Sequence, residues 1–324
     1  MTLRQSPETW LLLGGAGFIG SHVAKLMSES GVTVHILDNL STGLSSRVEN
    51  FASLHVGDAR DPNLIVDLCK KFEVCGVINL AAFMQARESV RDPIKYWSNN
   101  LGVSLALADA IKSLELQKVI LSSSCSVYGN LVNATEDSPL NPLSPYASTK
   151  VASEQILEQA CREKKTVFVS LRYFNVIGGG NFPNSIDTKP ETLIPSVCRK
   201  VFAGKNPVIF GKTLLTKDGT CERDYVDVRD LAAAHLKVSL HKEKFKNAYI
   251  NVSTGITISV LEIVTKILEI SGQHIGITYE SAKAGDPETV SAVPSKELLD
   301  LGWIPKYSLT DSISSHWAAF LKDQ

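Results

Sequence analysis

The sequence predicts an α/β protein built on a doubly wound parallel sheet, with a smaller mixed α/β domain toward the C-terminus. Three observations carry this prediction. Short, apolar, β-rich runs alternate with helix-compatible segments from the start of the chain. The length of 324 residues is enough for two domains, and 44% hydrophobic against 21% charged residues is the composition of a globular protein. Alternation of this kind is typical of βαβ units, in which a helix covers the sheet between two parallel strands.

The expected strands of the sheet are short apolar runs, which lie at residues 10–13, 32–37, 54–56, 74–80, 119–121 and 167–171. The two longest helices are expected at about 94–114 and 145–163. The alternation then fails in a loop of glycine, asparagine and proline at residues 178–184. We therefore expect a first domain of residues 1–175 and a second region of residues 176–324. Some strands and helices of the later region are expected to return to the first domain.

Composition and charge exclude several classes of protein. The 33 Lys+Arg and 34 Asp+Glu residues leave a net charge of -1, which steers no polyanion, so we expect no nucleic-acid partner. No apolar run reaches the ~18 residues of a membrane-spanning helix, so we expect no membrane partner. The six cysteines never fall in C-x-x-C spacing, and we expect no metal site. Because Met1–Trp10 lacks the pattern of a secretory signal, we expect a cytoplasmic location.

A glycine-rich turn follows the first expected strand. Gly14, Gly17 and Gly20 are evenly spaced before helix-compatible sequence, so that strand, tight turn and helix follow one another. This is the arrangement of a Rossmann-type dinucleotide-binding domain. In such a domain the amides of the first helical turn, here those of Phe18 and Ile19, approach a pyrophosphate at the positive end of the helix dipole. A tight turn also needs glycine when it binds nothing, so the motif depends on its context.

An acidic residue closes the second expected strand and supplies that context. Asp38 can accept hydrogen bonds from the ribose hydroxyls of an adenosine and would repel a 2'-phosphate, which favours NAD over NADP. We therefore expect NAD as the cofactor. Further contacts with it are expected beside this acid and after the third and fourth strands, at Asn39, Asp58, Ala59, Leu80, Ala81 and Ala82.

A tyrosine and a lysine begin the second long helix. Pro145 suits the first turn, so Tyr146 and Lys150, four residues apart, lie on one face and can address one site. A phenol with a pKa near ~10 is a poor base at neutral pH. An ammonium group within ~4–6 Å can lower that pKa by about 1–3 units, and a positive nicotinamide ring lowers it further. In isolation, such a pair is more often an exposed tyrosine and a solvated lysine.

Serines at the end of the preceding strand change the balance between these interpretations. Ser122, Ser123 and Ser124 follow the expected strand at 119–121, at the carboxyl edge where open α/β sheets bind their ligands. Ser124 can hydrogen-bond the substrate hydroxyl that loses its proton, whereas the alternative role of a serine run is turn formation. The pattern predicts a catalytic set of Ser124, Tyr146 and Lys150.

These motifs, in this order, resemble the extended short-chain dehydrogenase/reductase family over nearly the whole chain, and within it the sugar-nucleotide epimerases. The segments that carry the resemblance include Asp38–Leu40, Glu88–Val90, Asn99–Asn100, Arg172–Asn175, Asp218–Thr220, Arg223–Val226 and Gly302–Pro305. The resemblance implies a tightly held NAD and a UDP-hexose substrate, such as UDP-glucose, UDP-galactose or their N-acetyl forms. It further implies 4-epimerisation through a transient 4-keto sugar, and a homodimer joined through the two long helices. Residues 1–175 would bind NAD, and residues 176–324 would bind the UDP-sugar.

The resemblance also implies roles for single residues. Tyr146 would take the proton of the sugar 4-hydroxyl, with Ser124 as its hydrogen-bonding partner, and Lys150 would tune the phenol and grip the ribose. The remaining cofactor contacts would come from Asn99, Ser122 and Phe174. The remaining UDP-sugar contacts would come from Ser126, Asn175, Leu193, Phe210, Arg223, Lys283 and Asp286.

Two of these residues also have a chemical argument of their own. The guanidinium fork of Arg223 suits pyrophosphate oxygens, and its alternative role is a surface ion pair with Asp224 or Asp227. Asn175 lies at the end of a strand, where a buried amide needs partners that a ligand can supply.

The sequence departs from the family pattern at a few positions. Leu13 stands where threonine is often found before the glycines, and Met84 stands where some epimerases have a lysine near the cofactor. Lys283 replaces an arginine found on the diphosphate in many relatives, which keeps the charge but loses the bidentate fork. Val290 aligns with a bulky tyrosine that limits the sugar pocket in some epimerases, so a smaller residue here would admit an N-acetyl group.

Two alternatives to epimerisation stay open. A sugar-nucleotide 4,6-dehydratase needs an acid beside the catalytic hydroxyl, and neither Cys125 nor Ser126 is a carboxylic acid, while a uronate epimerase or a decarboxylase is less cleanly excluded. The second alternative is a non-catalytic NAD-binding regulatory protein, because a fold alone does not imply chemistry. The joint presence of Ser124, Tyr146 and Lys150 speaks against it.

Overall fold

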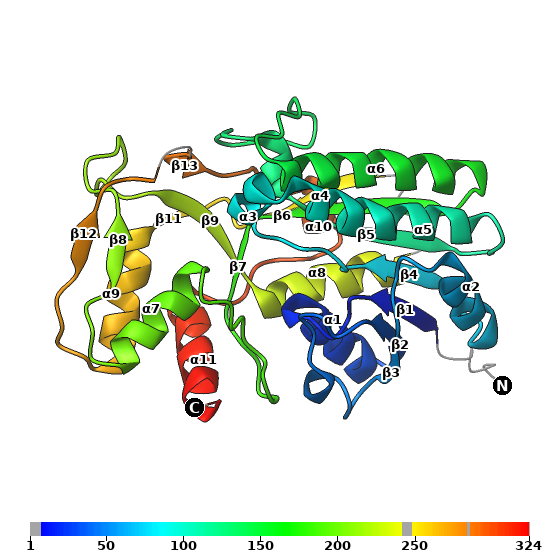
Figure 1. The fold of residues 1–324 in the computed structure, drawn as a ribbon, viewed down its shortest axis with the longest axis horizontal. Helices are drawn as coiled ribbons and strands as arrows, with labels where there is room; N and C mark the ends of the chain where they lie inside the picture. The colour runs from blue at the N-terminus through cyan, green and yellow to red at the C-terminus, as the bar shows by residue number, and fades with distance from the viewer. Residues whose placement is uncertain (1–7, 242–247, 284–285, 324) are drawn as a thin grey trace. The chain divides into compact units, whose positions relative to one another are not determined.

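The computed structural model describes residues 8–241, 248–283 and 286–323. The chain forms two compact units, each of which takes segments from several parts of the sequence (Figure 1). The first unit holds residues 1–129, 139–172 and 232–250, and the second holds residues 130–138, 173–231 and 251–324. Residues 1–7, which belong to the segment considered above for a secretory signal, lie outside the described residues. The functional division at residue 175 stays a prediction.

A seven-stranded sheet forms the centre of the first unit, in the order β10-β6-β5-β4-β1-β2-β3. Its strands are β1 (Thr9–Leu13), β2 (Thr33–Asp38), β3 (Ser53–Val56), β4 (Gly76–Asn79), β5 (Lys118–Ser124), β6 (Val167–Tyr173) and β10 (Ala248–Val252). β1 pairs in parallel with β2 and with β4, and the pairs β2–β3 and β4–β5 are parallel too. The predicted doubly wound sheet is confirmed. Its strand order reverses between β1 and β4, which is where such sheets bind ligands.

Helices cover both faces of this sheet. On one face, α2 (Pro62–Lys71), α5 (Gly102–Ile111) and α6 (Pro145–Glu163) bury apolar side chains in a common core with the strands. Figure 1 shows α1 (Phe18–Glu29) and α8 (Val228–Leu240) on the opposite side from α5 and α6. Among the residues that the structure describes, none of the helices has the length and apolar character needed to cross a bilayer.

The helix expected at 94–114 is interrupted. After α3 (Ala86–Arg91), it is observed as α4 (Pro93–Tyr96), a π-helical turn η2 (Trp97–Leu101) and α5 in succession. Because a π-helical turn holds one residue more than a regular turn, it changes the direction in which the side chains of η2 point. Single π-helical turns are frequent at functional sites, and the two asparagines singled out in the sequence lie in this one.

The start of α6 follows directly from the sequence. The hydroxyl of Ser144 accepts a hydrogen bond from the amide of Ala147 at 3.2 Å and caps the helix. Pro145 occupies the first helical position, where its missing N–H costs nothing and its fixed φ suits the helix. The same pattern of a polar cap followed by proline begins α2, where Asp61 precedes Pro62. These caps fix where Tyr146 stands on the helix.

The second unit is the smaller mixed α/β part that the sequence predicts. Its strands are β7 (Asn175–Ile177), β8 (Val208–Phe210), β9 (Glu222–Asp227), β11 (Thr257–Ser259), β12 (Thr278–Glu280) and β13 (Thr289–Val290). β9 is central, because it pairs in parallel with β7 and β13 and antiparallel with β11. The helices α7 (Leu193–Phe202), α9 (Val260–Ser271) and α11 (Leu309–Lys322) share one apolar core, and the short α10 (Lys296–Asp300) precedes α11.

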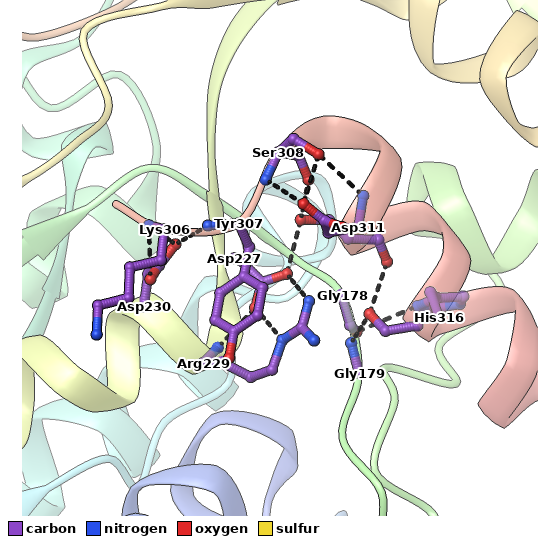
Figure 2. A network of polar contacts seen from close by, with 12 residues as sticks. Gly178, Gly179, Asp227, Arg229, Asp230, Lys306, Tyr307, Ser308, Asp311 and His316 are labelled. Carbon is purple, nitrogen blue, oxygen red and sulfur yellow. Dashed lines mark hydrogen bonds and ion pairs between the residues drawn. The ribbon is translucent and has the colours of Figure 1, made fainter. Parts of the chain in front are cut away.

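A network of buried polar contacts joins β7, β9 and α11 in this unit (Figure 2). The carboxylate of Asp227, at the end of β9, accepts two hydrogen bonds of 2.8 Å from the Arg229 guanidinium and one of 2.6 Å from Ser312 Oγ on α11. Gly178 follows β7 with a φ of +94°, and a Cβ there would lie 2.5 Å from Asp227 Oδ2. Only glycine therefore allows this approach.

The other residues of this network fix the segment that leads into α11. Asp230 accepts hydrogen bonds from the backbone amides of Lys306 and Tyr307, at 3.0 and 3.1 Å. Ser308 and Asp311 form a capping box at the start of the helix (Figure 2). Every carboxylate in this network thus has an architectural partner.

Candidate active site

The glycine turn lies between β1 and α1, and its glycines differ in their surroundings. A Cβ on Gly14, whose φ is +75°, would lie 2.6 Å from the Cα of Ala81, and a Cβ on Gly20 would lie 2.7 Å from the Gly14 oxygen. The packing of the chain on itself therefore requires both glycines. A Cβ on Gly17 would meet only the Gly14 oxygen, at 3.4 Å, so chain packing does not require glycine there. Gly17 is the N-cap of α1 and offers no capping side chain, which suits the binding of an anion at the helix start near Phe18 and Ile19.

Asp38 ends β2 and is buried beside this turn. One carboxylate oxygen accepts a hydrogen bond from the amide of Ala16 at 3.0 Å, and the other accepts one from the amide of Leu40 at 2.8 Å. Burial raises the pKa of this carboxyl group, and the two amides and the Arg47 guanidinium oppose the rise. Each oxygen keeps a lone pair for a further donor, so the geometry permits the predicted contact with a ribose diol.

Two further predicted cofactor segments follow β3 and β4. The carboxylate of Asp58 is held by the Arg60 side chain, whose Nε lies 3.0 Å from each oxygen, and this hydrogen-bonding guanidinium lowers the pKa of Asp58. After β4, the amide of Leu80 donates to the Leu13 carbonyl at 2.8 Å. The chain at Leu80 and Ala81 therefore runs directly beside the glycine turn, and its predicted contact with the cofactor stays a prediction.

Tyr146 and Ser124 are brought together although they lie on different elements. Tyr146, on the first turn of α6, is buried, and its side chain is hydrogen-bonded to Ser124 at the end of β5. The oxygen of Ser124 also accepts hydrogen bonds from the amide and the hydroxyl of Ser126, at 3.2 and 3.0 Å. Because those two bonds use the oxygen of Ser124, its own hydrogen is left for the phenol oxygen.

Lys150 lies one helical turn after Tyr146 and is buried as well. Its Nζ donates a hydrogen bond of 2.6 Å to the backbone carbonyl of Ser122 on β5, and it lies 5.9 Å from the centroid of the Tyr146 ring. Burial lowers the pKa of Lys150 to about 8, and the charge of Glu154 opposes this lowering. The lysine is therefore mostly cationic at neutral pH and close to its titration point.

The acidity of the phenol differs from the expectation. Burial raises the pKa of Tyr146 to about 12, although the hydrogen bond with Ser124 opposes the rise. Lys150 does not reverse this effect, because its ammonium group is hydrogen-bonded to a carbonyl and stands 5.9 Å from the ring centroid. In the chain by itself the lysine therefore does not lower the pKa of the phenol, and the expected acidification with NAD bound stays a prediction. Formation of a phenolate requires a further positive charge close to the ring.

An asparagine of the π-helical turn connects these parts of the site. Asn100 Oδ1 accepts a hydrogen bond from the amide of Phe83 at 2.9 Å, and Asn100 Nδ2 donates to Thr149 Oγ1 on α6 at 3.2 Å. It therefore ties the loop after β4 to the helix that carries Tyr146 and Lys150. The predicted cofactor residue Asn99 lies next to it and donates to Asn100 Oδ1 at 3.1 Å.

Arg223 of the second unit is held by the backbone. Its guanidinium donates hydrogen bonds of 2.7, 2.6 and 3.1 Å to the carbonyl oxygens of Glu222, Pro287 and Glu288. The alternative ion pairs with Asp224 and Asp227 are not observed, because Asp224 accepts hydrogen bonds from the 254–255 turn and Asp227 binds Arg229. Val290, which departs from the family pattern, pairs with Arg223 across β13 and β9.

Asn175 was expected to be buried, and this expectation was wrong. As the first residue of β7 it is exposed, because the strand enters the core only at Ile177. Its side chain is hydrogen-bonded to Tyr225 on the neighbouring strand β9. An exposed amide held at one end remains available to a ligand, so its predicted role in substrate binding stays a prediction.

The remaining predicted residues of the second unit lie in separate elements. Lys283 Nζ stands 3.6 Å from the centroid of the Phe210 ring, which places a predicted diphosphate ligand and a predicted uracil contact together. Leu193 begins α7 and packs against the core of the unit, and Asp286 is exposed. Phe174 is buried between β6 and β7. Ala284 and Gly285, between Lys283 and Asp286, lie outside the described residues.

Glu154, which the sequence motifs do not single out, is buried next to the predicted catalytic lysine. It forms an ion pair of 2.7 Å with Arg172 on β6 and is only 1% exposed. The available signal was its spacing, since Tyr146, Lys150 and Glu154 follow one another at four-residue intervals on a helix.

The topology of the sheet and the geometry of Ser124, Tyr146 and Lys150 define a domain of the short-chain dehydrogenase/reductase class. A sequence profile described as the NAD dependent epimerase/dehydratase family matches residues 10–253. The chain belongs to this family, which confirms the resemblance seen in the motifs.

Relatives with assigned activities match almost the whole chain. The UDP-glucose 4-epimerase of Lacticaseibacillus casei is 37% identical over 313 residues, which are 94% of this chain and 94% of that protein. Among solved structures, the UDP-glucose 4-epimerase from Brucella ovis in complex with NAD is 35% identical, with a TM-score of 0.90 over 97% of this chain and 98% of that chain. The UDP-glucose 4-epimerase from Bifidobacterium longum in complex with NAD+ and UDP is 32% identical, with a TM-score of 0.87 and the same coverage.

Proposed function

We propose that the protein is an NAD-dependent 4-epimerase of a UDP-hexose, with UDP-glucose and UDP-galactose as the first candidates. The observation that carries this proposal is the buried Tyr146, hydrogen-bonded to Ser124 and one turn before Lys150, in a member of an epimerase/dehydratase family. Similarity over nearly the full length to UDP-glucose 4-epimerases supports the same cofactor and substrate here.

The residues around the glycine turn fit NAD. The position beside Gly17 that a Cβ would fill, at the uncapped start of α1, suits a pyrophosphate, and the Asp38 carboxylate suits the ribose diol. The other proposed contacts come from segments next to these two, at Gly14, Phe18, Ile19, Gly20, Asn39, Asp58, Ala59, Leu80, Ala81, Ala82, Asn99, Ser122, Tyr146, Lys150 and Phe174. When bound, NAD supplies a positively charged ring and an acceptor that takes a hydride from sugar carbon 4 and returns it.

The chain's own residues move the proton in this reaction. Tyr146 Oη takes the proton of the sugar 4-hydroxyl and gives it back to the 4-keto oxygen, while Ser124 donates its hydrogen bond to Tyr146 Oη. Lys150 stays cationic and favours the phenolate. Because burial raises the pKa of Tyr146 to about 12, the phenolate is unfavourable until positive charge gathers around it. The keto sugar turns its other face toward the returning hydride, which inverts carbon 4 without net oxidation.

Residues of the second unit, with Ser126 of the first, are proposed to bind the UDP-sugar. Arg223 would donate to the diphosphate, because its fork is already oriented by backbone carbonyls. Lys283 and Phe210, which lie together, would contact the diphosphate and the uracil. The other proposed contacts are Asn175, Leu193 and Asp286. Interactions with the nucleotide hold the substrate while the sugar rotates.

One experiment tests the function. The purified protein is incubated with single UDP-sugars and no added cofactor, and the products are separated by chromatography. UDP-galactose should give UDP-glucose, with deuterium at carbon 4 retained in the product. The panel includes N-acetylated sugars, because the family resemblance implies that the small Val290 admits them, and uronates. A product of changed mass would favour dehydration or decarboxylation, and binding of NAD without conversion of any sugar would favour a regulatory protein.

A homodimer is proposed through the two long helices, on exposed apolar side chains of the first of them and of the preceding α3. Val90, Ile94 and Trp97 are 63%, 71% and 36% exposed, and Leu105 on α5 is 51% exposed. Exposed apolar side chains on neighbouring elements are typical of an interaction surface. Ile94→Lys should convert a dimer into a monomer in light scattering after gel filtration, and an unchanged mass would argue against this face.

A cytoplasmic location is proposed from the six cysteines, all of which are free thiols.

A further inference from the structure

Ionisable side chains follow one another along one face of α6. Tyr146, Lys150 and Glu154 stand at four-residue spacing, which places each about one turn after the last. All are buried, with exposed fractions of 9%, 5% and 1%. The proposed function uses the first two. A carboxylate is almost never fully buried unless it is paired, so Glu154 requires a specific explanation.

The Glu154 carboxylate is hydrogen-bonded to two strands of the sheet. Its Oε1 accepts hydrogen bonds of 2.7 Å from Ser123 Oγ on β5 and 2.7 Å from Ser170 Oγ on β6. The Arg172 guanidinium donates to both carboxylate oxygens, from Nε to Oε1 at 2.9 Å and from Nη2 to Oε2 at 2.7 Å. Bidentate pairs of this kind are geometrically rigid. Glu154 therefore fixes α6 against β5 and β6 at one point.

That point lies beside both catalytic side chains. Ser123 stands between Ser122, whose carbonyl accepts the hydrogen bond of Lys150, and Ser124, which is hydrogen-bonded to Tyr146. The hydrogen bond from Ser123 to Glu154 thus holds the short stretch of β5 on which the other two contacts depend. A shift of this stretch would change the positions of the phenol and the ammonium together.

The guanidinium of Arg172 is itself fixed by aromatic residues. Its Nη1 donates to Tyr128 Oη at 2.9 Å, and its Cζ lies 4.4 Å from the centroid of the Tyr249 ring. Both rings add cation–π stabilisation. Glu154 is therefore bound to an anchored partner, and its negative charge has a fixed position relative to Lys150.

The charge of Glu154 acts on Lys150. Burial lowers the pKa of Lys150 to about 8, and Glu154 is the charged neighbour that opposes this effect. Other charged or titratable side chains lie on the elements packed against α6. They include Arg87, Glu88 and Arg91 on α3, Lys95 and Tyr96 on α4, Asp109 on α5, Lys118 on β5, Cys125 and Tyr128 in the 3-10 turn Cys125–Tyr128, Arg172 on β6, and Tyr249 on β10. Of these, Glu88 pairs with Lys95, Asp109 with Lys112, Lys118 with backbone carbonyls, and Tyr249 with Glu158.

We propose that Glu154 is a positioning residue that keeps Lys150 cationic and holds Ser122 and Ser124 in place for Lys150 and Tyr146. This inference rests on the proposed function of Lys150. Loss of the Glu154 charge would lower the pKa of Lys150 further, so that a larger fraction of the lysine would be neutral at physiological pH and the phenolate of Tyr146 would lose part of the positive charge beside it. The residue acts through Lys150 and not on the substrate.

The test is a direct titration of Lys150 together with a pH profile of turnover. Protein labelled with carbon-13 at the lysine ε-carbon is titrated by NMR, and the Lys150 signal is identified by its loss in Lys150→Met. In Glu154→Gln the midpoint should fall by at least ~1 pH unit, the effect of removing one close opposite charge. The alkaline limb of kcat should move to lower pH by the same amount. Glu158→Gln, one turn further along α6, should leave both unchanged.

Glu154→Gln leaves the Arg172 charge buried without its partner, and such a variant can fail to fold. The double variant E154Q/R172M removes both charges of the pair, which proteins tolerate better, and should show the same fall in the Lys150 midpoint. An unchanged midpoint in a folded Glu154 variant would overturn the inference. Absence of UDP-sugar conversion by the unmodified protein would instead overturn the proposed function, and the NMR midpoint would still decide the role of Glu154.

Discussion

The two units each contain a buried cluster of charges. The clusters differ in whether one of their groups has a pKa close to neutral pH. In the network of Figure 2, Asp227 is paired with Arg229, and Asp230 is satisfied by backbone amides of the segment that it holds. On α6, Glu154 is equally well satisfied, but its neighbour Lys150 is left with a pKa of about 8. Buried charges therefore occur both in the structural network of the second unit and in the cluster on α6. A group held near its titration point distinguishes the cluster on α6, which is the proposed catalytic one.

The largest expected effect separates the phenol of Tyr146 on α6 from the phenol of Tyr307 in the network of Figure 2. Tyr146→Phe should lower kcat for UDP-galactose by about 10³-fold, because it removes the group that moves the proton. Tyr307→Phe keeps the ring that lies 3.5 Å from the Arg229 guanidinium and should leave kcat unchanged. Turnover is measured by chromatography, and folding of both variants is checked by circular dichroism. Similar turnover in Tyr146→Phe and the unmodified protein would remove Tyr146 from the mechanism.

Removal of a cation should change stability in opposite directions in the two clusters. Arg229→Met leaves the fully buried carboxylate of Asp227 without its ion pair and should cost about 3 kcal/mol of unfolding free energy. Lys150→Met should instead stabilise the fold by about 1 kcal/mol while abolishing most activity, because burial disfavours the charged lysine. Urea denaturation measures both. A loss of stability in Lys150→Met would mean that its hydrogen bond to Ser122 outweighs the cost of burying the charge.

Acid should destabilise the second unit through one histidine. Burial lowers the pKa of His316 on α11 to about 4, below its usual value of 6.5. The unfolded chain therefore binds more protons than the folded chain between these values, and stability falls as the pH drops through this window, by about 2 kcal/mol at pH 5. His316→Asn cannot titrate, and its amide can still donate to the Gly178 carbonyl that the histidine contacts at 3.4 Å. Urea denaturation at pH 7 and pH 5 should show a smaller difference in this variant.

The smallest expected effect concerns single hydroxyls. Ser126→Ala removes a 3.0 Å hydrogen bond to the Ser124 oxygen and should lower kcat about 3-fold with little change in stability. Ser315→Ala removes the acceptor of the Gly179 amide at 3.1 Å and should cost about 1 kcal/mol with no change in kcat. If both variants changed only stability, the hydrogen bond to Ser124 would be structural.

Local patterns were enough to predict the frame of the first unit. The strand and glycine turn that precede α1, the acid at the end of β2 and the helix start at Pro145 each depend on residues that are neighbours in the chain. The same holds for the shared face of Tyr146 and Lys150, which the periodicity of one helix determines.

Contacts between distant segments could not be predicted in this way. The pairing of Glu154 with Arg172 requires α6 to lie against β6, and the bonds of Arg223 to carbonyls at 287 and 288 require β13 to lie beside β9. The raised pKa of Tyr146 follows from its depth of burial, which the spacing of the motif does not contain. For the same reason the exposure of Asn175 was missed, since a strand pattern does not tell which end enters the core.

The π-helical turn at Trp97–Leu101 is in effect a single extra residue in an otherwise regular helix. Deleting one residue there would restore ordinary pairing, but it would rotate one half of the helix by about 100° relative to the other. Asn100 could then no longer reach both Phe83 and Thr149. The extra residue thus directs Asn100 toward Phe83 and Thr149. A chain without it would need another side chain to attach the loop after β4 to α6.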